Sequence, residues 1–281
     1  MFRTRFAPSP TGPLHLGHAY SALLAHDMAT AQGGRFLLRI EDIDQTRARP
    51  EWETQIYDDL HWLGLDWPRP VMRQSDRMAA YEAALDLLWS RRLLYPCTCS
   101  RRDIENAASA PQEGVPLHGP DGMIYPGTCR TSASRSGPRP RGVTLRLDMA
   151  LAVEGHAGLN FTETGVKPGT VPVLPAALVA EVGDVVLARR DMGTSYHLSV
   201  VIDDADQAIS HVVRGEDLFE ATQIHVLLQA LLDRPTPVYH HHRLIRDDQG
   251  KRLAKRDDAR AISLYRREGM TPGEIRSLIG L

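Results

Sequence analysis

The sequence has no apolar run that approaches the roughly 20 residues that a helix needs to cross a bilayer. Its N-terminus offers too short an apolar stretch for the hydrophobic region of a secretory signal. Apolar residues make up 42% of the chain and charged residues 24%, which is ordinary for a soluble globular protein. We therefore expect a cytoplasmic protein with no membrane partner, and 281 residues suffice for two or three compact units.

Cysteine is also scarce, and neither sign of charge is in excess. Three cysteines in a chain without a secretory signal argue against a disulfide framework. The formal net charge is -2, so the overall charge does not announce a nucleic-acid partner. Local charge is less even, because residues 251–267 carry seven basic side chains against two aspartates. One basic face can still bind phosphates, although solvated surface charge is an equally good interpretation of any single arginine pair, such as residues 189–190.

The two common nucleotide-binding fingerprints are missing as well. No Gly-x-Gly-x-x-Gly follows an expected strand, and no Gly-x-x-x-x-Gly-Lys-Ser/Thr occurs. The chain nevertheless opens with a strand at residues 4–7, an apolar helical pattern at 16–28 and a buried strand at 35–40. This arrangement is typical of a βαβ crossover. The sequence therefore predicts an α/β fold with a mostly parallel sheet.

Residues 95–142 differ in composition from the rest of the chain. Proline, glycine, serine and arginine dominate there, periodicity disappears, and all three cysteines fall in this stretch, so we expect an insertion with its own small fold. Around it, the patterns predict helices at 52–63, 77–92 and 222–232 (the last capped by Thr222), strands at 143–147, 184–189 and 209–214, a strand or strand–helix element at 195–203, and a helix that starts at Thr271-Pro272.

Residues 15–18, His-Leu-Gly-His, follow the first expected strand, at the edge where open parallel sheets bind ligands. Two imidazoles three residues apart share one helix face, so both can reach one phosphate group. Gly17 lacks a Cβ, which lets an adenine ring lie close to the backbone, and the helix N-terminus adds partial positive charge. By itself, a His-x-x-His pattern is more typical of two surface histidines.

Longer stretches carry a resemblance to a known family. Residues 5–18, Arg-Phe-Ala-Pro-Ser-Pro-Thr-Gly-Pro-Leu-His-Leu-Gly-His, resemble the opening of glutamyl-tRNA synthetases, and the last four resemble the HIGH signature of class I synthetases. Residues 252–256, Arg-Leu-Ala-Lys-Arg, resemble the second signature, KMSKS. Further similar segments are residues 38–44, 196–204 and 213–217. The match runs in order over nearly the whole chain.

The resemblance implies that both signatures bind ATP. An arginine stands at the first lysine position of KMSKS and Ala254 replaces its serine, but Lys255 remains. A flexible ammonium suits the charge that develops on the leaving pyrophosphate. We therefore predict His15, His18 and Lys255 as catalytic residues. The predicted ATP site comprises Pro8, His15, Gly17, His18, Arg252, Lys255 and Arg256.

The same resemblance implies glutamate as the amino acid. Arg5 and Arg214 would bind its carboxylates, because a guanidinium fork matches a planar carboxylate. Glu41 would accept from the α-ammonium group. Val200 stands where the full-length family tends to have asparagine, a departure that bears on glutamate affinity. The predicted glutamate site comprises Arg5, Ala7, Ser9, Glu41, Tyr196 and Arg214.

The implied fold is a Rossmann-type class I synthetase catalytic domain. Its two halves would cover residues 1–94 and 143–240. The segment 95–142 would be an inserted, zinc-bearing subdomain of the acceptor-binding type. Residues 241–281 would hold the KMSKS-like loop and the start of a helical stem-contact segment, with no anticodon-binding domain.

The acceptor is suggested by the short stretch, about 25 residues, that follows the second signature. Full glutamyl-tRNA synthetases continue there into helical domains, and the shorter pattern resembles glutamyl-queuosine tRNA(Asp) synthetases. The expected reaction makes glutamyl-adenylate from L-glutamate and Mg²⁺-bound ATP and transfers glutamate to the queuosine base at the wobble position of tRNA(Asp). We expect a monomer. The alternatives are a glutamyl-tRNA synthetase fragment that charges a tRNA 3′ end, or a non-catalytic tRNA-binding paralogue.

The cysteines predict one structural Zn²⁺ in the inserted segment. Cys97, Cys99 and Cys129 need a fourth ligand to close a tetrahedral site. Imidazole from His118 is the chemically commoner choice, but the branch that the chain resembles has Tyr-x-x-x-Cys, which favours Tyr125. Three unrelated free cysteines are the alternative. The histidines at residues 240–242 are expected to follow a strand near the nucleotide site and receive no ligand role.

Overall fold

The computed structural model describes residues 1–108, 118–245 and 260–281 of the chain. Its central strands are β1 (Arg3–Phe6), β2 (Arg35–Ile40), β3 (Met72–Arg73), β11 (His211–Gly215) and β12 (Val238–His242). The pairs β1–β2, β2–β3 and β11–β12 are all parallel. The Ser210 N–H donates to the Arg3 carbonyl oxygen at 3.0 Å, which joins β1 to β11. The predicted α/β fold with a mostly parallel sheet is confirmed.

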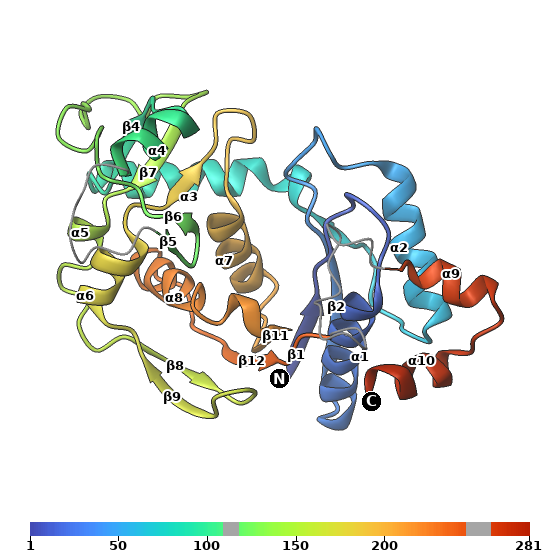
Figure 1. Cartoon of the computed structure of the whole chain (residues 1–281). Helices are drawn as coiled ribbons and strands as arrows, with labels where there is room; N and C mark the ends of the chain where they lie inside the picture. The colour runs from blue at the N-terminus through green and yellow to red at the C-terminus, as the bar shows by residue number, and fades with distance from the viewer. Residues whose placement is uncertain (109–117, 246–259) are drawn as a thin grey trace.

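Helices flank this sheet in two groups (Figure 1). The helices are α1 (Leu16–Ala31), α2 (Pro50–Trp62), α3 (Met78–Ser90), α7 (Tyr196–Asp206), α8 (Thr222–Leu231), α9 (Ile262–Arg267) and α10 (Pro272–Ile279). In Figure 1, α1, α2, α9 and α10 lie on the side of β2, whereas α7 and α8 lie on the side of β12. Each group buries its apolar residues in its own hydrophobic cluster, the first including Leu23 and Ile275 and the second Leu198 and Leu227.

A second, antiparallel sheet stands apart from the parallel one. It contains β4 (Leu94–Cys97), β7 (Thr144–Leu147) and β10 (Val186–Ala188), with β7 in the middle. β4 covers the first residues of the segment 95–142, which we expected to be a separate insertion, and β7 follows that segment. A further hairpin, β8 (Asn160–Glu163) and β9 (Gly169–Pro172), extends the parallel sheet beyond β12.

The remaining described elements are short. They are η1 (Gln74–Arg77), α4 (Arg101–Ala108), β5 (His118–Gly119), β6 (Gly122–Met123), α5 (Met149–Ala152), α6 (Pro175–Ala177), η2 (Leu178–Val182) and η3 (Glu216–Leu218). The turn of the hairpin formed by β5 and β6 lines the pocket that is described below as the candidate active site.

Three local predictions were wrong or incomplete. Residues 195–203 do not form a strand: they open α7, whose N-cap Ser195 accepts from the Leu198 N–H, and a short apolar run cannot by itself distinguish a buried strand from a buried helix. Thr222 is not a cap, because its hydroxyl instead accepts from Arg214 and the N-cap position is Ala221. The three histidines do not follow a strand but end β12 itself.

The start of α10 agrees with its prediction. Thr271 caps the helix through the Glu274 N–H, and the Glu274 carboxylate accepts from the Thr271 N–H in return. Pro272 occupies the first turn, where its missing N–H costs no hydrogen bond. Sequence signals for helix starts are therefore reliable here when several coincide.

A buried ion network ties α7 to the two strands that carry the site. Arg39 of β2 is fully buried, and its guanidinium lies 2.7 Å from Asp204 and 3.0 Å from Glu41. Arg5 of β1 holds the same aspartate through two hydrogen bonds of 3.0 and 3.2 Å. Burial alone would raise the pKa of Asp204, but the charges and hydrogen bonds of Arg5 and Arg39 outweigh it and hold that pKa at about 2.

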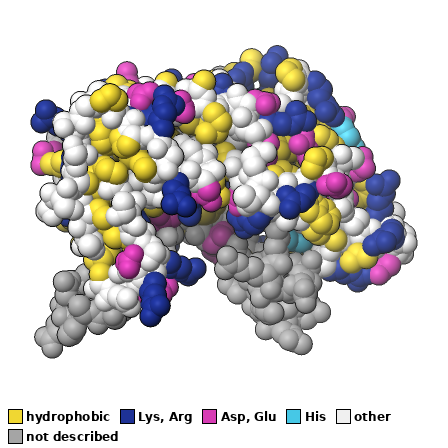
Figure 2. Space-filling view, turned by 90° about the horizontal axis from the view of Figure 1, so that it is seen from above, with side chains coloured by type: hydrophobic (Ala, Val, Ile, Leu, Met, Phe, Trp, Pro, Cys, Tyr) yellow, Lys and Arg dark blue, Asp and Glu magenta, His cyan; other side chains and the backbone are white. Residues whose placement is uncertain are grey.

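The surface gives little guidance about partners. No helix in the described part of the chain is long and apolar enough to cross a membrane. On the face in Figure 2, lysine and arginine side chains are spread out, with acidic and apolar side chains between them. Both signs of charge are therefore mixed on the coloured part of this face.

We predict that Asp204→Asn lowers the free energy of unfolding by about 3–5 kcal/mol, because it removes the carboxylate that pairs with the buried Arg5 and one of those that pair with Arg39. Asp206→Asn on the same helix is the matched control. Asp206 pairs with Arg77 and Arg234 near the surface, so its loss should cost less than about 1 kcal/mol. Urea titration followed by circular dichroism measures both variants. Equal destabilisation by the two would contradict the structural role of the network.

Candidate active site

The first motif lies where β1 gives way to α1. His15 is the N-cap of α1, and its Nδ1 accepts from the Gly17 N–H at 3.1 Å. The Nδ1 of His18 accepts in turn from the His15 N–H at 3.2 Å. Because both Nδ1 atoms are acceptors, the proton of each neutral imidazole lies on Nε2. The two ring centroids are 3.8 Å apart, so the pair forms one hydrogen-bonding group at the helix N-terminus.

The chain returns to this motif after the second signature. Outside the described residues lie the three predicted cations of that signature, Arg252, Lys255 and Arg256. Ala261, six positions after Lys255, forms an antiparallel bridge with His15, and the Ile262 N–H donates to the Leu14 carbonyl oxygen at 2.9 Å. The C-terminal flank of the second signature is therefore fixed beside the first.

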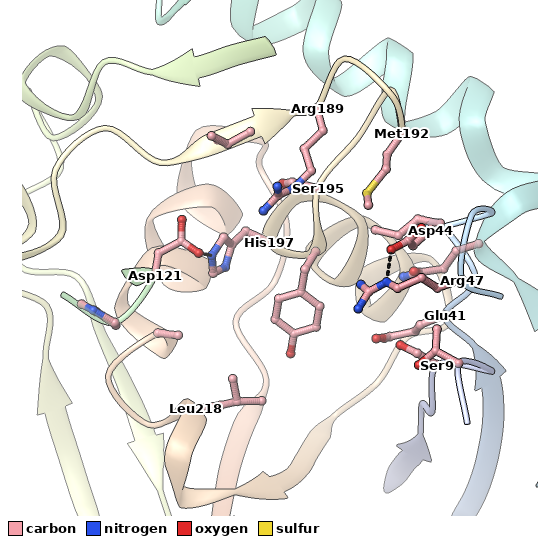
Figure 3. Close-up of a pocket in the computed structure, with 17 residues that line it drawn as sticks. Ser9, Glu41, Asp44, Arg47, Asp121, Arg189, Met192, Ser195, His197 and Leu218 are labelled. Carbon is pink, nitrogen blue, oxygen red and sulfur yellow. Dashed lines mark hydrogen bonds and ion pairs between the residues drawn. The ribbon is translucent and has the colours of Figure 1, made fainter. Parts of the chain in front are cut away.

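A pocket of about 410 Å³ opens at the carboxyl ends of β1 and β2, next to the first turn of α7. This is the edge of a parallel sheet at which ligands bind. Figure 3 shows Arg189 on one side of the pocket, with Ser9 and Glu41 on the opposite side. The lining residues include Ser9, Thr11, Glu41, Asp44, Arg47, Asp121, Arg189, Ser195, Tyr196, His197 and Leu218.

Three of the predicted glutamate-binding residues line this pocket: Ser9, Glu41 and Tyr196. Burial raises the pKa of the Glu41 carboxyl, an effect that Arg39 and Arg5 oppose. Burial also raises the pKa of the Tyr196 phenol, which therefore keeps its proton near neutral pH. The pocket thus offers a buried carboxyl, a neutral phenol and a hydroxyl.

The two predicted arginines do not line the pocket, and each is held by the protein. Arg5 is bound by Asp204, as described above. Arg214, at the end of β11, donates from Nε to His241 Nε2 at 3.1 Å and from Nη2 to Thr222 Oγ1 at 2.7 Å. Both guanidinium groups are buried and fixed in direction.

Pro8 makes a backbone contact next to the pocket, and Ala7 is its neighbour in the chain. The Pro8 carbonyl oxygen accepts from the Glu41 N–H at 3.0 Å, which ties the loop after β1 to the end of β2. Ala7 precedes it directly after β1, and its side chain is half-buried. This contact holds Ser9 and Glu41 on the same side of the pocket.

Sequence reasoning missed most of the other pocket residues, among them Arg189, Asp121 and His197. Arg189 was visible only as half of an arginine pair, which surface charge explains equally well. Asp121 lies in the turn between β5 and β6, within a segment that has no periodicity, and accepts from His197 Nε2 at 3.0 Å. Nothing in the sequence signals this contact, because it joins residues 76 positions apart.

The cysteine cluster forms a candidate metal centre away from the main pocket. The Sγ atoms of Cys97, Cys99 and Cys129 all lie within 4.8 Å of one another. The Tyr125 hydroxyl lies 3.4 Å from Cys97 Sγ and 3.3 Å from Cys99 Sγ, and the Cys129 N–H donates to it at 2.9 Å. His118 is not part of this group among the described residues.

The parallel sheet, the histidine pair at the first strand–helix junction and the pocket at the strand ends together define a class I synthetase catalytic domain. The family model described as tRNA synthetases class I (E and Q), catalytic domain, matches residues 1–123 and 172–281. The chain belongs to this family and is an aminoacyl-tRNA synthetase-like ligase.

Among its relatives the chain is similar to glutamyl-Q tRNA(Asp) synthetases. It is 64% identical to the one from Rhodobacter capsulatus over 99% of both chains. It is 42% identical to the one from Nocardia farcinica, over 98% of this chain and 82% of that protein. These relatives confirm the branch that the sequence suggested.

Solved structures agree on the fold. A glutamate tRNA ligase from Elizabethkingia meningosepticum, in complex with its amino acid, superposes with a TM-score of 0.76 and 27% identity. One from Elizabethkingia anophelis gives a TM-score of 0.77 and 26% identity. This chain is covered completely in both comparisons but spans only 60% and 61% of those two proteins.

Proposed function

We propose that the chain activates L-glutamate with ATP and transfers the glutamyl group to queuosine at the wobble position of tRNA(Asp). The observation that carries the proposal is the 64% identity, over 99% of both chains, to a protein named glutamyl-Q tRNA(Asp) synthetase. A pocket with a carboxyl, a phenol and a hydroxyl, lined in part by the loop that joins β1 to the histidine pair, is compatible with an amino acid.

In the first step, a glutamate carboxylate oxygen attacks the α-phosphorus of ATP, and the bond to pyrophosphate breaks. His15 and His18 would donate from Nε2 to phosphate oxygens, with the backbone of Pro8 and Gly17 beside the nucleotide. Lys255 would neutralise the leaving pyrophosphate, assisted by Arg252 and Arg256. Mg²⁺ would enter with ATP, held mainly by phosphates and water.

The amino acid would be held by groups of opposite charge. Glu41 would accept from the α-ammonium, and Arg5 and Arg214 would bind carboxylate oxygens. Ser9 and Tyr196 would add neutral hydrogen bonds, next to the backbone of Ala7. Burial raises the pKa of the Glu41 carboxyl because it disfavours the charged form. A cationic partner in the same buried site would offset this cost, so the site favours a cation.

In the second step, a hydroxyl oxygen of the cyclopentene ring of queuosine attacks the acyl carbon of glutamyl-adenylate. The new ester bond forms, the bond to AMP breaks, and the hydroxyl proton leaves. Positioning and charge stabilisation would supply most of the rate, because neither step needs a redox group.

We also propose that the cysteine cluster holds one structural Zn²⁺ through Cys97, Cys99, Cys129 and Tyr125. A tetrahedron with Zn–S bonds of about 2.3 Å has sulfur atoms about 3.8 Å apart. The Cys99–Cys129 sulfur distance of 3.5 Å is close to that value, and three thiolates are a donor set that zinc favours. Such an ion would staple β4 to the segment that carries Tyr125.

The acceptor is tested with labelled glutamate and queuosine-containing tRNA(Asp). We expect the label to stay on the tRNA after its 3′-terminal adenosine is removed, and tRNA(Asp) without queuosine to remain unlabelled. Label that leaves with the adenosine would show 3′-end charging instead. No labelling together with no glutamate-dependent pyrophosphate exchange would favour a non-catalytic tRNA-binding protein.

Lys255→Ala should lower glutamate-dependent pyrophosphate exchange by roughly 100-fold, because a cation that meets developing charge acts mainly in the transition state. Glutamate binding, measured by calorimetry, should change little. Lys251→Ala is the matched control, since it removes the same side chain from the same basic segment. A loss of binding as large as the loss of exchange would argue against a role at the pyrophosphate.

The metal is tested by elemental analysis of the purified protein. We expect one zinc per chain, lost in Cys97→Ser and in Cys129→Ser. His118→Ala should retain the zinc and Tyr125→Phe should weaken it, which decides between the two candidate fourth ligands. Full zinc content in both cysteine variants would rule the site out.

A further inference from the structure

Buried histidines connect Arg214 to the main pocket. Nη1 of Arg214 lies 3.1 Å from His225 Nδ1, and His225 Nε2 lies 3.0 Å from His197 Nδ1. His197 Nε2 lies 3.0 Å from the Asp121 Oδ1 atom, which faces the pocket (Figure 3). The side chains of Arg214, His225 and His197 are all buried. A continuous hydrogen-bond chain therefore runs from Asp121 to Arg214.

Arg214 fixes the direction of every bond in this chain. A guanidinium has donors and no acceptor, so His225 Nδ1 must accept from it. The proton of neutral His225 then lies on Nε2 and is donated to His197 Nδ1. His197 in turn carries its proton on Nε2 and donates it to the Asp121 carboxylate. Each imidazole has one possible tautomer.

A second series of hydrogen bonds, which we call the second arm, runs from Arg214 through His241 to Glu163, and its directions are fixed in the same way. Nε of Arg214 donates to His241 Nε2 at 3.1 Å, so the proton of His241 lies on Nδ1 and is donated to Glu163 Oε2 at 2.6 Å. Nη2 of Arg214 donates to Thr222 Oγ1 and to the Leu218 carbonyl oxygen. Four of the five guanidinium donors are thus used, and among the described residues the second Nη1 hydrogen has no acceptor.

Both arms require neutral imidazoles. A proton added to His225 would set two donors against each other, at Arg214 or at His197. Burial, followed by the charge of Arg214, lowers the pKa of His225 well below its usual value. Burial and Arg214 likewise lower the pKa of His241 to about 4, against the opposing effect of Glu163. His225 and His241 are therefore neutral near neutral pH, as the contacts with Arg214 require.

The hairpin that carries Asp121 is itself held against the body of the protein. A Cβ at Gly119 would lie 2.0 Å from the Glu181 carbonyl oxygen of η2, so only glycine permits this approach. The hairpin that carries the Asp121 carboxylate is therefore packed closely against η2.

We propose that Asp121, His197 and His225 are positioning residues that aim the remaining N–H of Arg214 at a carboxylate ligand. The inference rests on the proposed function in one respect, since it takes this ligand to be the glutamate substrate. This chain of hydrogen bonds sets the affinity for that substrate, and it links the β5–β6 hairpin to Arg214. ATP affinity does not depend on it.

Substitution of His225 separates hydrogen bonding from packing. His225→Gln can still accept from Arg214 and donate to His197, whereas His225→Met fills the space without either bond. In glutamate-dependent pyrophosphate exchange, we expect His225→Met to raise the KM for glutamate roughly tenfold, because bonds to charged groups are the strong ones. His225→Gln should stay within about threefold of the parent, and KM for ATP should be unchanged in both.

His156→Met, at a half-buried histidine outside this hydrogen-bond chain, controls for the substitution itself. A glutamate KM that is unchanged in His225→Met, or raised equally in both His225 variants, would overturn the proposal. Melting temperatures identify any variant that fails to fold, and for such a variant Asp121→Ala replaces it with the same expected rise in glutamate KM.

The hydrogen-bond chain can also be tested by spectroscopy, which does not depend on enzymatic activity. Nitrogen-15 NMR of histidine-labelled protein at neutral pH should show His197 and His225 protonated on Nε2 and His241 on Nδ1. A charged ring or the opposite tautomer at any of the three would overturn the chain. If the parent protein shows no glutamate-dependent exchange, the proposed function fails, while these tautomers still decide whether the chain exists.

Discussion

The buried guanidinium of Arg39 is the constraint on which the rest of the site depends. An uncompensated charge in the interior costs several kcal/mol, so carboxylates must be brought to it. They come from Glu41 at the end of its own strand and from Asp203 and Asp204 on α7. The helix can satisfy this requirement only in one position along the sheet. Tyr196, in the first turn of the same helix, is thereby set against the pocket.

The two arginines of the proposed glutamate site are held in different electrical surroundings. Arg5 shares Asp204 with Arg39, so much of its charge is already compensated by a carboxylate. Arg214 contacts imidazoles, a hydroxyl and a carbonyl oxygen, and its hydrogen bonds reach the carboxylates of Glu163 and Asp121 only through one or two imidazoles. Neutral acceptors fix direction without cancelling charge. Arg214 therefore retains more attraction for an incoming anion than Arg5 does.

The sequence predicted those features of the fold and site that depend on residues close together in the chain. The βαβ opening, the capped start at Thr271 and the histidine pair at residues 15–18 depend on neighbours within a few positions, and their fold or placement was predictable. The membership of Ser9, Glu41 and Tyr196 in one pocket followed from the family resemblance. Asp121 and His225 were missed, because their contacts lie far apart in sequence and polar bonds leave no periodicity.

The charge balance around Glu41 suggests why the pocket suits a zwitterion. Burial raises the pKa of this carboxyl although Arg39 lies 3.0 Å away, so the charged form is only partly compensated in the protein alone. A bound ammonium would supply the missing compensation, and the accompanying carboxylate would meet the field of Arg214. The ammonium group of an amino acid would then compensate the buried charge of Glu41, and its carboxylate would compensate that of Arg214. A ligand that carries only one of the two charges would leave the other unrelieved, which favours an amino acid over a simple amine or a simple acid.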